Sequence, residues 1–305
     1  MRGVFHTLSA LLAGFIVVCS PFVLSAQAQA VQCEPAGGFQ AWVKSFKAAH
    51  SNLSPRTLAA LDGATLDQQV LRLDRNQRHF KQSFEQFSRS RITAGRLNKG
   101  RSMLKRHAAL LKRIEQRFGV PPEVVVAIWG LETDYGVNMG KQQAIRSLAT
   151  LAYDCRRTDM FQRELLAALQ IIERGDLRPS EMRGAWAGEL GQTQFLPSSY
   201  LRFAVDFDGN GRRDLIRSVP DVLASTANYL KGYGWSPGAG WGPGQPNFAA
   251  LKGWNKADVY ARTIALFAEK LSTSQSSSRE PAGVPTQRDR QVTTTTKSSP
   301  CQRSC

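Results

Sequence analysis

The segment Val120–Gly136 holds the most promising candidate for acid–base chemistry in the chain and reads VPPEVVVAIWGLETDYG. On a helix starting at Pro121, Ile128 and Trp129 lie four and three residues before Glu132, so the carboxyl shares the apolar stripe near the helix C-terminus. Burial, the lack of a Lys or Arg at helical spacing and the negative helix end would each raise the pKa of Glu132. A carboxyl protonated near neutral pH is suited to protonate a glycosidic oxygen. The alternative is a structural Glu that is bonded to backbone or paired with a distant Arg.

A second carboxylate is the usual partner of such an acid, at roughly 5 to 10 Å in most glycosidases. Asp134 follows Glu132 by two residues, which is about 200° around a helix, so it points away; Glu189 is the other candidate. One acid is enough when the substrate supplies the nucleophile. Glu132 would protonate the leaving oxygen and then, as a carboxylate, deprotonate a sugar hydroxyl that attacks its own anomeric carbon. The product would be an internal anhydro sugar.

A second pattern, DFDGNGRRD at residues 206–214, has the alternating oxygen ligands and central glycine of an EF-hand loop. Position 12 of that loop is Arg217 in place of the usual Glu, so the loop is not an ordinary EF-hand. The predicted ion is calcium, with a structural role, and the alternative is an Asx-rich turn without tight metal binding. The predicted ligands in this acidic loop (residues 206–217) are Asp206, Asp208, Asn210, Arg212 through its carbonyl, and Asp214.

Helical periodicity dominates the rest of the chain from about Phe39 to Leu271, and strand signals are weak. Pro55 indicates a helix start, and the apolar spacing of residues 104–118 predicts a helix that ends near Gly119. A further helix is expected over residues 161–172. The segment Gly232–Pro246 is rich in Gly, Pro and Trp and is expected to form a loop. The predicted fold class is therefore mainly α.

The two ends of the chain differ in composition from this helical region. Residues 1–30 have a basic start, an apolar run and small residues before Ala28 and Ala30, which is typical of a secretory signal peptide; the alternative is an uncleaved anchor. Residues 272–305 contain almost no apolar side chains and are expected to be a disordered basic tail. Residues 31–271 would form the functional domain.

The formal net charge is +16, and removal of the leader would leave about one charge less, since Arg2 is its only charged residue. A basic exported protein is attracted to anionic polymers, and no nucleic-acid module is recognisable.

Four cysteines lie beyond the leader, and in an oxidising compartment they are expected to pair. Cys33 with Cys155 would tie the N-terminus to the core, and Cys301 with Cys305 would close a small loop in the tail. Three arrangements are possible, and the sequence does not choose among them.

Three motifs, in this order, carry a family resemblance: WGLETDYG at Trp129–Gly136, GAWAGELGQTQFLPSSY at Gly184–Tyr200, and ANY at Ala227–Tyr229. Together they resemble the membrane-bound lytic murein transglycosylase B family over about residues 39–271. The resemblance implies a lysozyme-like helical catalytic domain with an EF-hand-like cation loop. It also implies non-hydrolytic cleavage between N-acetylmuramic acid (MurNAc) and N-acetylglucosamine (GlcNAc), leaving 1,6-anhydromuramic ends.

The same resemblance implies roles for single residues. It makes Glu132 the acid and base, and it suggests that Asp221 closes the cation site. Many members have Ser at the position of Ala185, where a hydroxyl can bond the catalytic carboxyl, so one contact is missing here. The implied substrate-binding residues are Arg156, Arg157, Gln192, Gln194, Tyr229, Trp254 and Asn255. The alternatives to substrate binding are surface charges for Arg156 and Arg157, a core position for Trp254 and a structural hydrogen bond for Gln194.

The leading hypothesis is an enzyme that acts on peptidoglycan glycan strands in the periplasm, without a cofactor for its chemistry. We expect a monomer that binds no nucleic acid and is at most peripheral to a membrane. The alternatives are a hydrolytic muramidase, a non-catalytic wall-binding protein and, least favoured, a calcium-regulated interaction protein.

Overall fold

The structure is a computed structural model that describes residues 30–76 and 82–276. These residues are mostly helical, which confirms the predicted fold class. The predicted leader, most of the predicted tail, Cys301 and Cys305 lie outside the described residues. The helices, with two short 3₁₀ turns (η), are α1 (Gly38–Ala49), α2 (Pro55–Leu58), η1 (Ala59–Leu61), α3 (Gln68–Arg75), α4 (Phe84–Arg91), α5 (Ala94–Arg106), α6 (Ala108–Phe118), α7 (Pro122–Thr133), α8 (Ala144–Tyr153), α9 (Thr158–Glu173), η2 (Pro179–Glu181), α10 (Pro197–Phe203), α11 (Val219–Gly232), α12 (Phe248–Trp254) and α13 (Asp258–Ser276).

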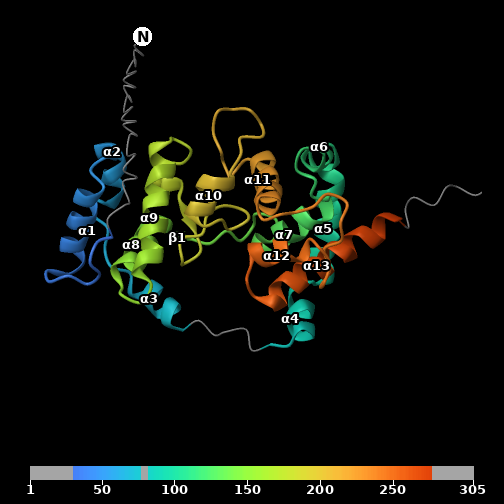
Figure 1. Cartoon of the computed structure of the whole chain (residues 1–305), viewed down its shortest axis with the longest axis horizontal. Coiled ribbons are helices and arrows are strands. Elements are labelled where there is room, and N and C mark those ends of the chain that lie inside the picture. Colours follow the sequence, from blue (N-terminus) through green and yellow to red (C-terminus); the bar gives the residue numbers. More distant parts are fainter. Residues whose placement is uncertain (1–29, 77–81, 277–305) are drawn as a thin grey trace, which may run out of the picture.

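The helices gather in two groups, which Figure 1 shows side by side. One group contains α1, α2, α3, α8 and α9, and the other contains α4 to α7 with α11, α12 and α13. Helix α10 packs against both α9 and α11 and so joins the groups. The apolar side chains of both groups form one continuous core.

Helix α7 runs through the second group and packs against α5, α6, α11 and α13. It has Pro121 at its N-cap and Pro122 in its first turn, positions where a missing N–H costs nothing. Every residue from Val124 to Leu131 is buried. The helix ends at Thr133, and Asp134 follows in the left-handed region with φ 53°. The predicted helix up to Glu132 is thus confirmed.

Most of the other predicted helix limits are confirmed, and one is wrong. Ser54 caps the helix at Pro55, residues 161–172 lie within α9, and Gly119 ends α6 with φ 75°. The periodicity from residue 104 to 118, however, spans two helices that meet at His107 (φ −108°, ψ 20°). The apolar spacing continues across this bend because the apolar residues of both helices pack into the same core.

A short antiparallel ribbon places the second motif against the chain that follows α7. Strand β1 (Gln142–Gln143) pairs with β2 (Arg183–Gly184), and Gly184 lies opposite Gln142. Isolated bridges then fold residues 184–195 back on themselves through Leu190. The ribbon is too short for the period-two pattern that predicts strands from sequence.

Cys33 and Cys155 form a disulfide with a Cα–Cα distance of 5.2 Å, which confirms the first predicted pairing. The bond joins the segment before α1 to the turn between α8 and α9. Within residues 30–76 and 82–276, none of the helices has both the length and the apolar character needed to cross a lipid bilayer.

Candidate active site

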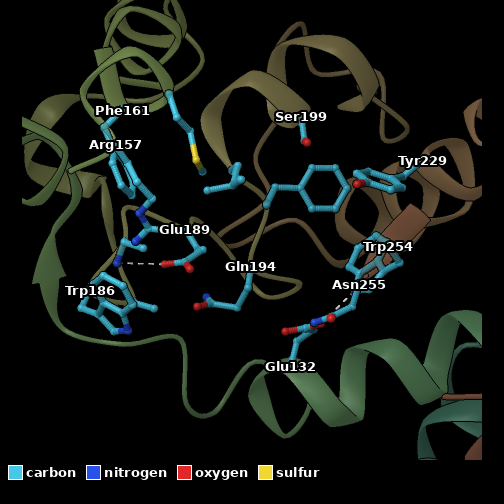
Figure 2. Close-up of a pocket in the computed structure, with 15 residues that line it drawn as sticks. Glu132, Arg157, Phe161, Trp186, Glu189, Gln194, Ser199, Tyr229, Trp254 and Asn255 are labelled. Atoms are coloured by element: carbon cyan, nitrogen blue, oxygen red, sulfur yellow. Dashed lines mark hydrogen bonds between the residues drawn. The ribbon is translucent and has the colours of Figure 1, made fainter. Parts of the chain in front are cut away.

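A cavity of about 480 Å³ is lined by residues from both helix groups and from the second motif. Figure 2 shows Glu132 at the end of α7, with Trp254 and Asn255 beside it and Arg157 across the cavity. Rings, amides, acids and a guanidinium group share the lining, a composition suited to a sugar polymer with charged substituents. The predicted site residues in this lining are Glu132, Arg157, Gln194, Tyr229, Trp254 and Asn255.

Glu132 is held from one side by two donors. The indole Nε1 of Trp254 donates to Glu132 Oε1 at 2.8 Å, and the hydroxyl of Tyr260 donates to the same oxygen at 2.9 Å. Oε2 therefore has no hydrogen-bond partner among the residues that the structure describes. This fixed orientation leaves one carboxyl oxygen available to carry a proton.

Burial raises the pKa of Glu132 to about 7, while the bonds from Trp254 and Tyr260 work in the opposite direction and the charge of Glu189 adds to the rise. A carboxyl with that pKa is partly protonated at neutral pH. It can give a proton to a leaving oxygen and take one back within a single turnover.

Three rings form one wall of the cavity next to this carboxyl. Trp254 meets Tyr229 edge-on with ring centroids 4.7 Å apart, and Phe195 meets both rings at 5.4 and 5.5 Å. Such edge-to-face contacts fix ring orientation. The Tyr229 hydroxyl donates to the carbonyl of Gly253, so it holds the end of α12 rather than Glu132.

The opposite wall carries charge. The guanidinium of Arg157 lies 4.8 Å from the centre of the Phe161 ring, and Glu189 accepts a bond from the backbone N–H of Ala187 at 3.1 Å. Burial raises the pKa of Glu189, and its backbone bonds and the charge of Arg157 oppose that rise. Figure 2 shows Gln194 between Glu189 and Glu132. Its amide donates to the carbonyls of Met139 and Gly191, so its oxygen remains for a ligand.

Two predicted substrate-binding residues lie outside this lining. Gln192 is 8% exposed and is bonded to Trp129 and to the carbonyl of Ile216. Arg156 forms a two-point ion pair with the buried carboxylate of Asp74, at 2.7 and 3.1 Å. The family resemblance implied both residues as substrate-binding, whereas in this structure their side chains bond the partners named above.

The neighbouring Arg157 also bonds Asp74 but keeps a place in the cavity lining. Asp74 is 1% exposed and receives both guanidinium groups, which hold its pKa below the usual range against the effect of burial. Of the Arg pair, only Arg157 lines the cavity.

Tyr260 bonds the candidate acid and was not among the residues predicted from the sequence. It lies in the first turn of α13 and is 128 residues from Glu132 in the chain, so no local spacing connects the two. Trp186, Glu189 and Ser199, which also line the cavity, all fall within the second motif. That motif was the available signal for them.

Asp134, excluded above as a second carboxylate, is directed away from the cavity. Its carboxylate lies 3.4 Å from both Arg96 and Lys99 on α5. Ala185 lines the cavity, and the hydrogen bonds to Glu132 come from Trp254 and Tyr260.

The acidic loop lies between α10 and α11, apart from this cavity. Oxygens of Asp206, Asp208 and Asp221 lie within 4.8 Å of one another, a spacing that fits one ion with calcium–oxygen distances of 2.3–2.6 Å. Asp214 is not in this cluster and accepts bonds from Arg217 Nε at 2.8 Å and from backbone.

The other two predicted ligands contribute to the loop in different ways. The side-chain oxygen of Asn210 accepts from the N–H of Arg212 at 2.9 Å. The Arg212 guanidinium reaches the carbonyl of Asp176, which leaves only its own carbonyl for an ion.

Comparison with known proteins finds similarity in both sequence and fold. A membrane-bound lytic murein transglycosylase B of Escherichia coli (strain K12) is 38% identical over 164 residues, which are 51% of this chain and 45% of that protein. The chain thus matches about half of the length of this relative. SltB3 of Pseudomonas aeruginosa, solved in complex with NAG-anhNAM-pentapeptide, is similar with a TM-score of 0.73 and 32% identity, covering 77% of this chain and 79% of SltB3.

The Escherichia coli lytic transglycosylase Slt35, solved in complex with calcium, has a TM-score of 0.68 and 27% identity, covering 78% of this chain and 93% of Slt35. These likenesses support the predicted lysozyme-like helical fold. The model of the family described as "Transglycosylase SLT domain" matches residues 38–245, which include α7 and the whole second motif. The chain therefore belongs to the transglycosylase SLT domain family.

Proposed function

We propose that the protein is a peptidoglycan lytic transglycosylase that cleaves the β-1,4 bond between MurNAc and GlcNAc and leaves 1,6-anhydromuramic ends. The observation that carries the proposal is the half-buried Glu132, oriented by Trp254 and Tyr260 and given a pKa of about 7. The chain's membership of the transglycosylase SLT domain family supports the same reaction. So does the ligand of SltB3, which contains an anhydro sugar.

Glu132 performs both proton transfers in this reaction. Its protonated Oε2 donates to the glycosidic oxygen as the bond from that oxygen to the anomeric carbon breaks. The resulting carboxylate then takes the proton of the MurNAc 6-hydroxyl, whose oxygen forms the new bond to the same anomeric carbon. No water is consumed, and Glu132 ends protonated and ready for the next cycle.

The remaining lining residues would bind and orient the glycan. Trp254 and Tyr229 offer ring faces and edges to the sugars, and Gln194 and Asn255 offer amides to acetamido groups. Arg157 would pair with a carboxylate of the lactyl group or stem peptide. Gln192 and Arg156 take no part in contacting the substrate in this proposal, because they lie outside the cavity lining.

Calcium binding in the acidic loop is part of the proposal. Asp206, Asp208 and Asp221 would supply carboxylate oxygens, and the carbonyl of Arg212 is available as in an EF-hand. The calcium complex of Slt35 supports this assignment. The ion would brace the chain between α10 and α11, and the acid–base chemistry of Glu132 needs no metal.

We further propose a periplasmic location, because the substrate is found there and residues 1–30 have the pattern of a signal peptide. Residues 31–271 would act as the catalytic domain and residues 272–305 as a basic tail. The protein would act as a monomer on glycan strands, with at most a peripheral attachment to membrane.

Digestion of purified peptidoglycan followed by mass spectrometry tests the reaction. The mature protein should release anhydro-muropeptides, and Glu132→Gln should release none. Glu123→Gln, the same change at the other end of α7, is the matched control and should retain activity. Binding of Glu132→Gln to peptidoglycan without turnover by the wild type would instead indicate a wall-binding protein.

Hydrolysis is the second candidate, and the presence of Glu189 in the same cavity favours it. A water-activating base must be ionised, yet burial raises the pKa of Glu189, so we rank hydrolysis lower. Reducing-end products, abolished in Glu189→Gln, would identify a muramidase. Anhydro products that persist in Glu189→Gln would support the transglycosylase.

A further inference from the structure

Gln192 is buried and lies outside the cavity lining, and each of its polar groups makes a hydrogen bond. Trp129 Nε1 donates to Gln192 Oε1 at 2.9 Å, and Gln192 Nε2 donates to the carbonyl of Ile216 at 2.9 Å. Its backbone N–H donates to the carbonyl of Leu215 at 2.8 Å, and its carbonyl accepts from the hydroxyl of Thr133 at 2.5 Å. One residue thus joins α7 to the end of the acidic loop.

The two partners on α7 flank the candidate acid. Trp129 lies one turn before Glu132, and Thr133 directly follows it. The Thr133 hydroxyl also accepts from the N–H of Gly136 at 2.8 Å, so the chain that leaves the helix is held at the same point. A rotation of this turn would carry the Glu132 carboxyl away from the donors Trp254 and Tyr260.

Two glycines make the close approach around Gln192 sterically possible. A Cβ on Gly136, which has φ +82°, would lie 2.5 Å from Gln192 Oε1. A Cβ on Gly191, with φ +76°, would lie 2.4 Å from the carbonyl oxygen of Leu215. Both contacts are too short for any other residue, and both backbone conformations favour glycine. The packing on each side of Gln192 is therefore specified by the sequence.

We infer that Gln192 is a positioning residue, which fastens the turn of α7 that carries Glu132 to the end of the acidic loop. The conformation of the acidic loop then affects the position of the Glu132 carboxyl through Leu215, Ile216 and Gln192. None of these three residues needs to contact the substrate. The catalytic consequence depends on the proposed function, whereas the physical link does not. A buried amide with both ends bonded is suited to this task, because a shift of either partner leaves a buried polar group of the amide without its bond.

Titration of Glu132 by NMR on protein labelled with ¹³C-glutamate tests the link, with Glu132→Gln identifying the signal. Gln192→Met keeps the length of the side chain and removes both amide bonds. We expect the pKa of Glu132 to fall from about 7 by about one unit. Burial is the largest cause of the raised pKa, so regained access to water outweighs the loss of the bonds from Trp254 and Tyr260, which by itself would raise the pKa. Thr133→Val, which removes the hydroxyl bond and keeps the shape, should shift the pKa in the same direction.

The matched control is Gln162→Met. Gln162 is also a buried glutamine, 6% exposed, but it bonds the backbone of Val31 and the hydroxyl of Thr158. Its loss should lower the melting temperature without moving the pKa of Glu132. An equal shift in Gln162→Met, or no shift in Gln192→Met and Thr133→Val under conditions where each is folded, would overturn the inference.

Turnover of peptidoglycan gives the second readout. We expect kcat of Gln192→Met to fall about tenfold with KM little changed, and the alkaline limb of its pH profile should move with the pKa of Glu132. A loss of affinity with unchanged kcat would indicate substrate contact and contradict the positioning role. The NMR titration needs no turnover, so it decides the link even if the wild type releases no anhydro sugars, a result that would overturn only the proposed function.

Discussion

The indole of Trp254 donates to Glu132 Oε1 at 2.8 Å across 122 residues of sequence. Trp254 ends α12, and Glu132 lies in the last turn of α7, so the bond joins the ends of two helices. Edge-on contacts with Phe195 and Tyr229 fix the indole ring in turn. The orientation of the candidate acid is therefore set by a ring that also forms the wall of the cavity.

Trp254→Phe should raise the pKa of Glu132 above about 7, because the indole bond opposes the effect of burial. We expect the alkaline limb of the pH profile of kcat to move up by about one unit. Lost orientation worth about 1.4 kcal/mol would lower kcat about tenfold. Trp241→Phe is the control, since its indole N–H has no partner among the described residues. Identical pH profiles for the two variants would contradict the role of the bond.

Glu132→Gln should make the protein more stable at pH 8 than the wild type. The pKa of Glu132 is raised from 4.5 to about 7 in the fold, so the folded state favours the protonated form. Protonation of Glu132 contributes up to about 3 kcal/mol to the free energy of unfolding. This contribution is fully present below pH 4.5 and is lost as pH rises through about 7. Gln mimics the protonated acid, so the variant keeps this stability at high pH.

Melting temperatures measured from pH 4 to pH 8 check this linkage. The two proteins should melt within a narrow range of each other at pH 4, and the gap in favour of Glu132→Gln should open between pH 5 and pH 8. Parallel curves over the whole range would show that Glu132 titrates as an ordinary surface carboxyl.

Calcium should raise the melting temperature of the wild type, because it binds only the folded acidic loop. At one hundred times its Kd an ion adds about 2.7 kcal/mol, and each kcal/mol is worth about 2–4 °C in a domain of this size. Asp208→Asn should weaken the response, whereas Asp214→Asn should retain it, since Asp214 bonds Arg217 outside the cluster. Calorimetry with calcium and with magnesium makes the comparison. An unchanged response in Asp208→Asn would exclude the three-carboxylate cluster.

The two adjacent arginines should respond differently to the same substitution. Arg157→Gln is expected to raise KM for peptidoglycan that carries stem peptides more than KM for glycan stripped of them, since Arg157 lines the cavity. Arg156→Gln should mainly lower stability, by about 1–3 kcal/mol, because buried Asp74 loses its two-point partner. KM on both substrates and melting temperatures separate the two effects. A larger KM effect from Arg156→Gln would reverse the assignment.

The sequence by itself determined the local elements and the candidate acid. Proline at the start of α7 and an unbroken apolar run specify that helix, and the family motifs point to Glu132 as the acid near its end. The EF-hand-like spacing likewise indicated Asp206 and Asp208 as candidate metal ligands, because the ligands in such a loop are only a few residues apart in the sequence. These features depend on neighbours within one or two helical turns, which a sequence pattern records directly.

Only the tertiary structure decided which side chains meet. Tyr260 reaches Glu132 because α13 packs on α7, and no spacing in the chain encodes a contact across 128 residues. Gln192 and Gln194 are two residues apart in one motif, yet Gln192 bonds Trp129 outside the cavity lining and Gln194 lines the cavity. The same holds for Arg156 and Arg157 around Asp74. Side-chain direction in such irregular segments follows from backbone turns and long-range hydrogen bonds, and these exist only once the helices have packed.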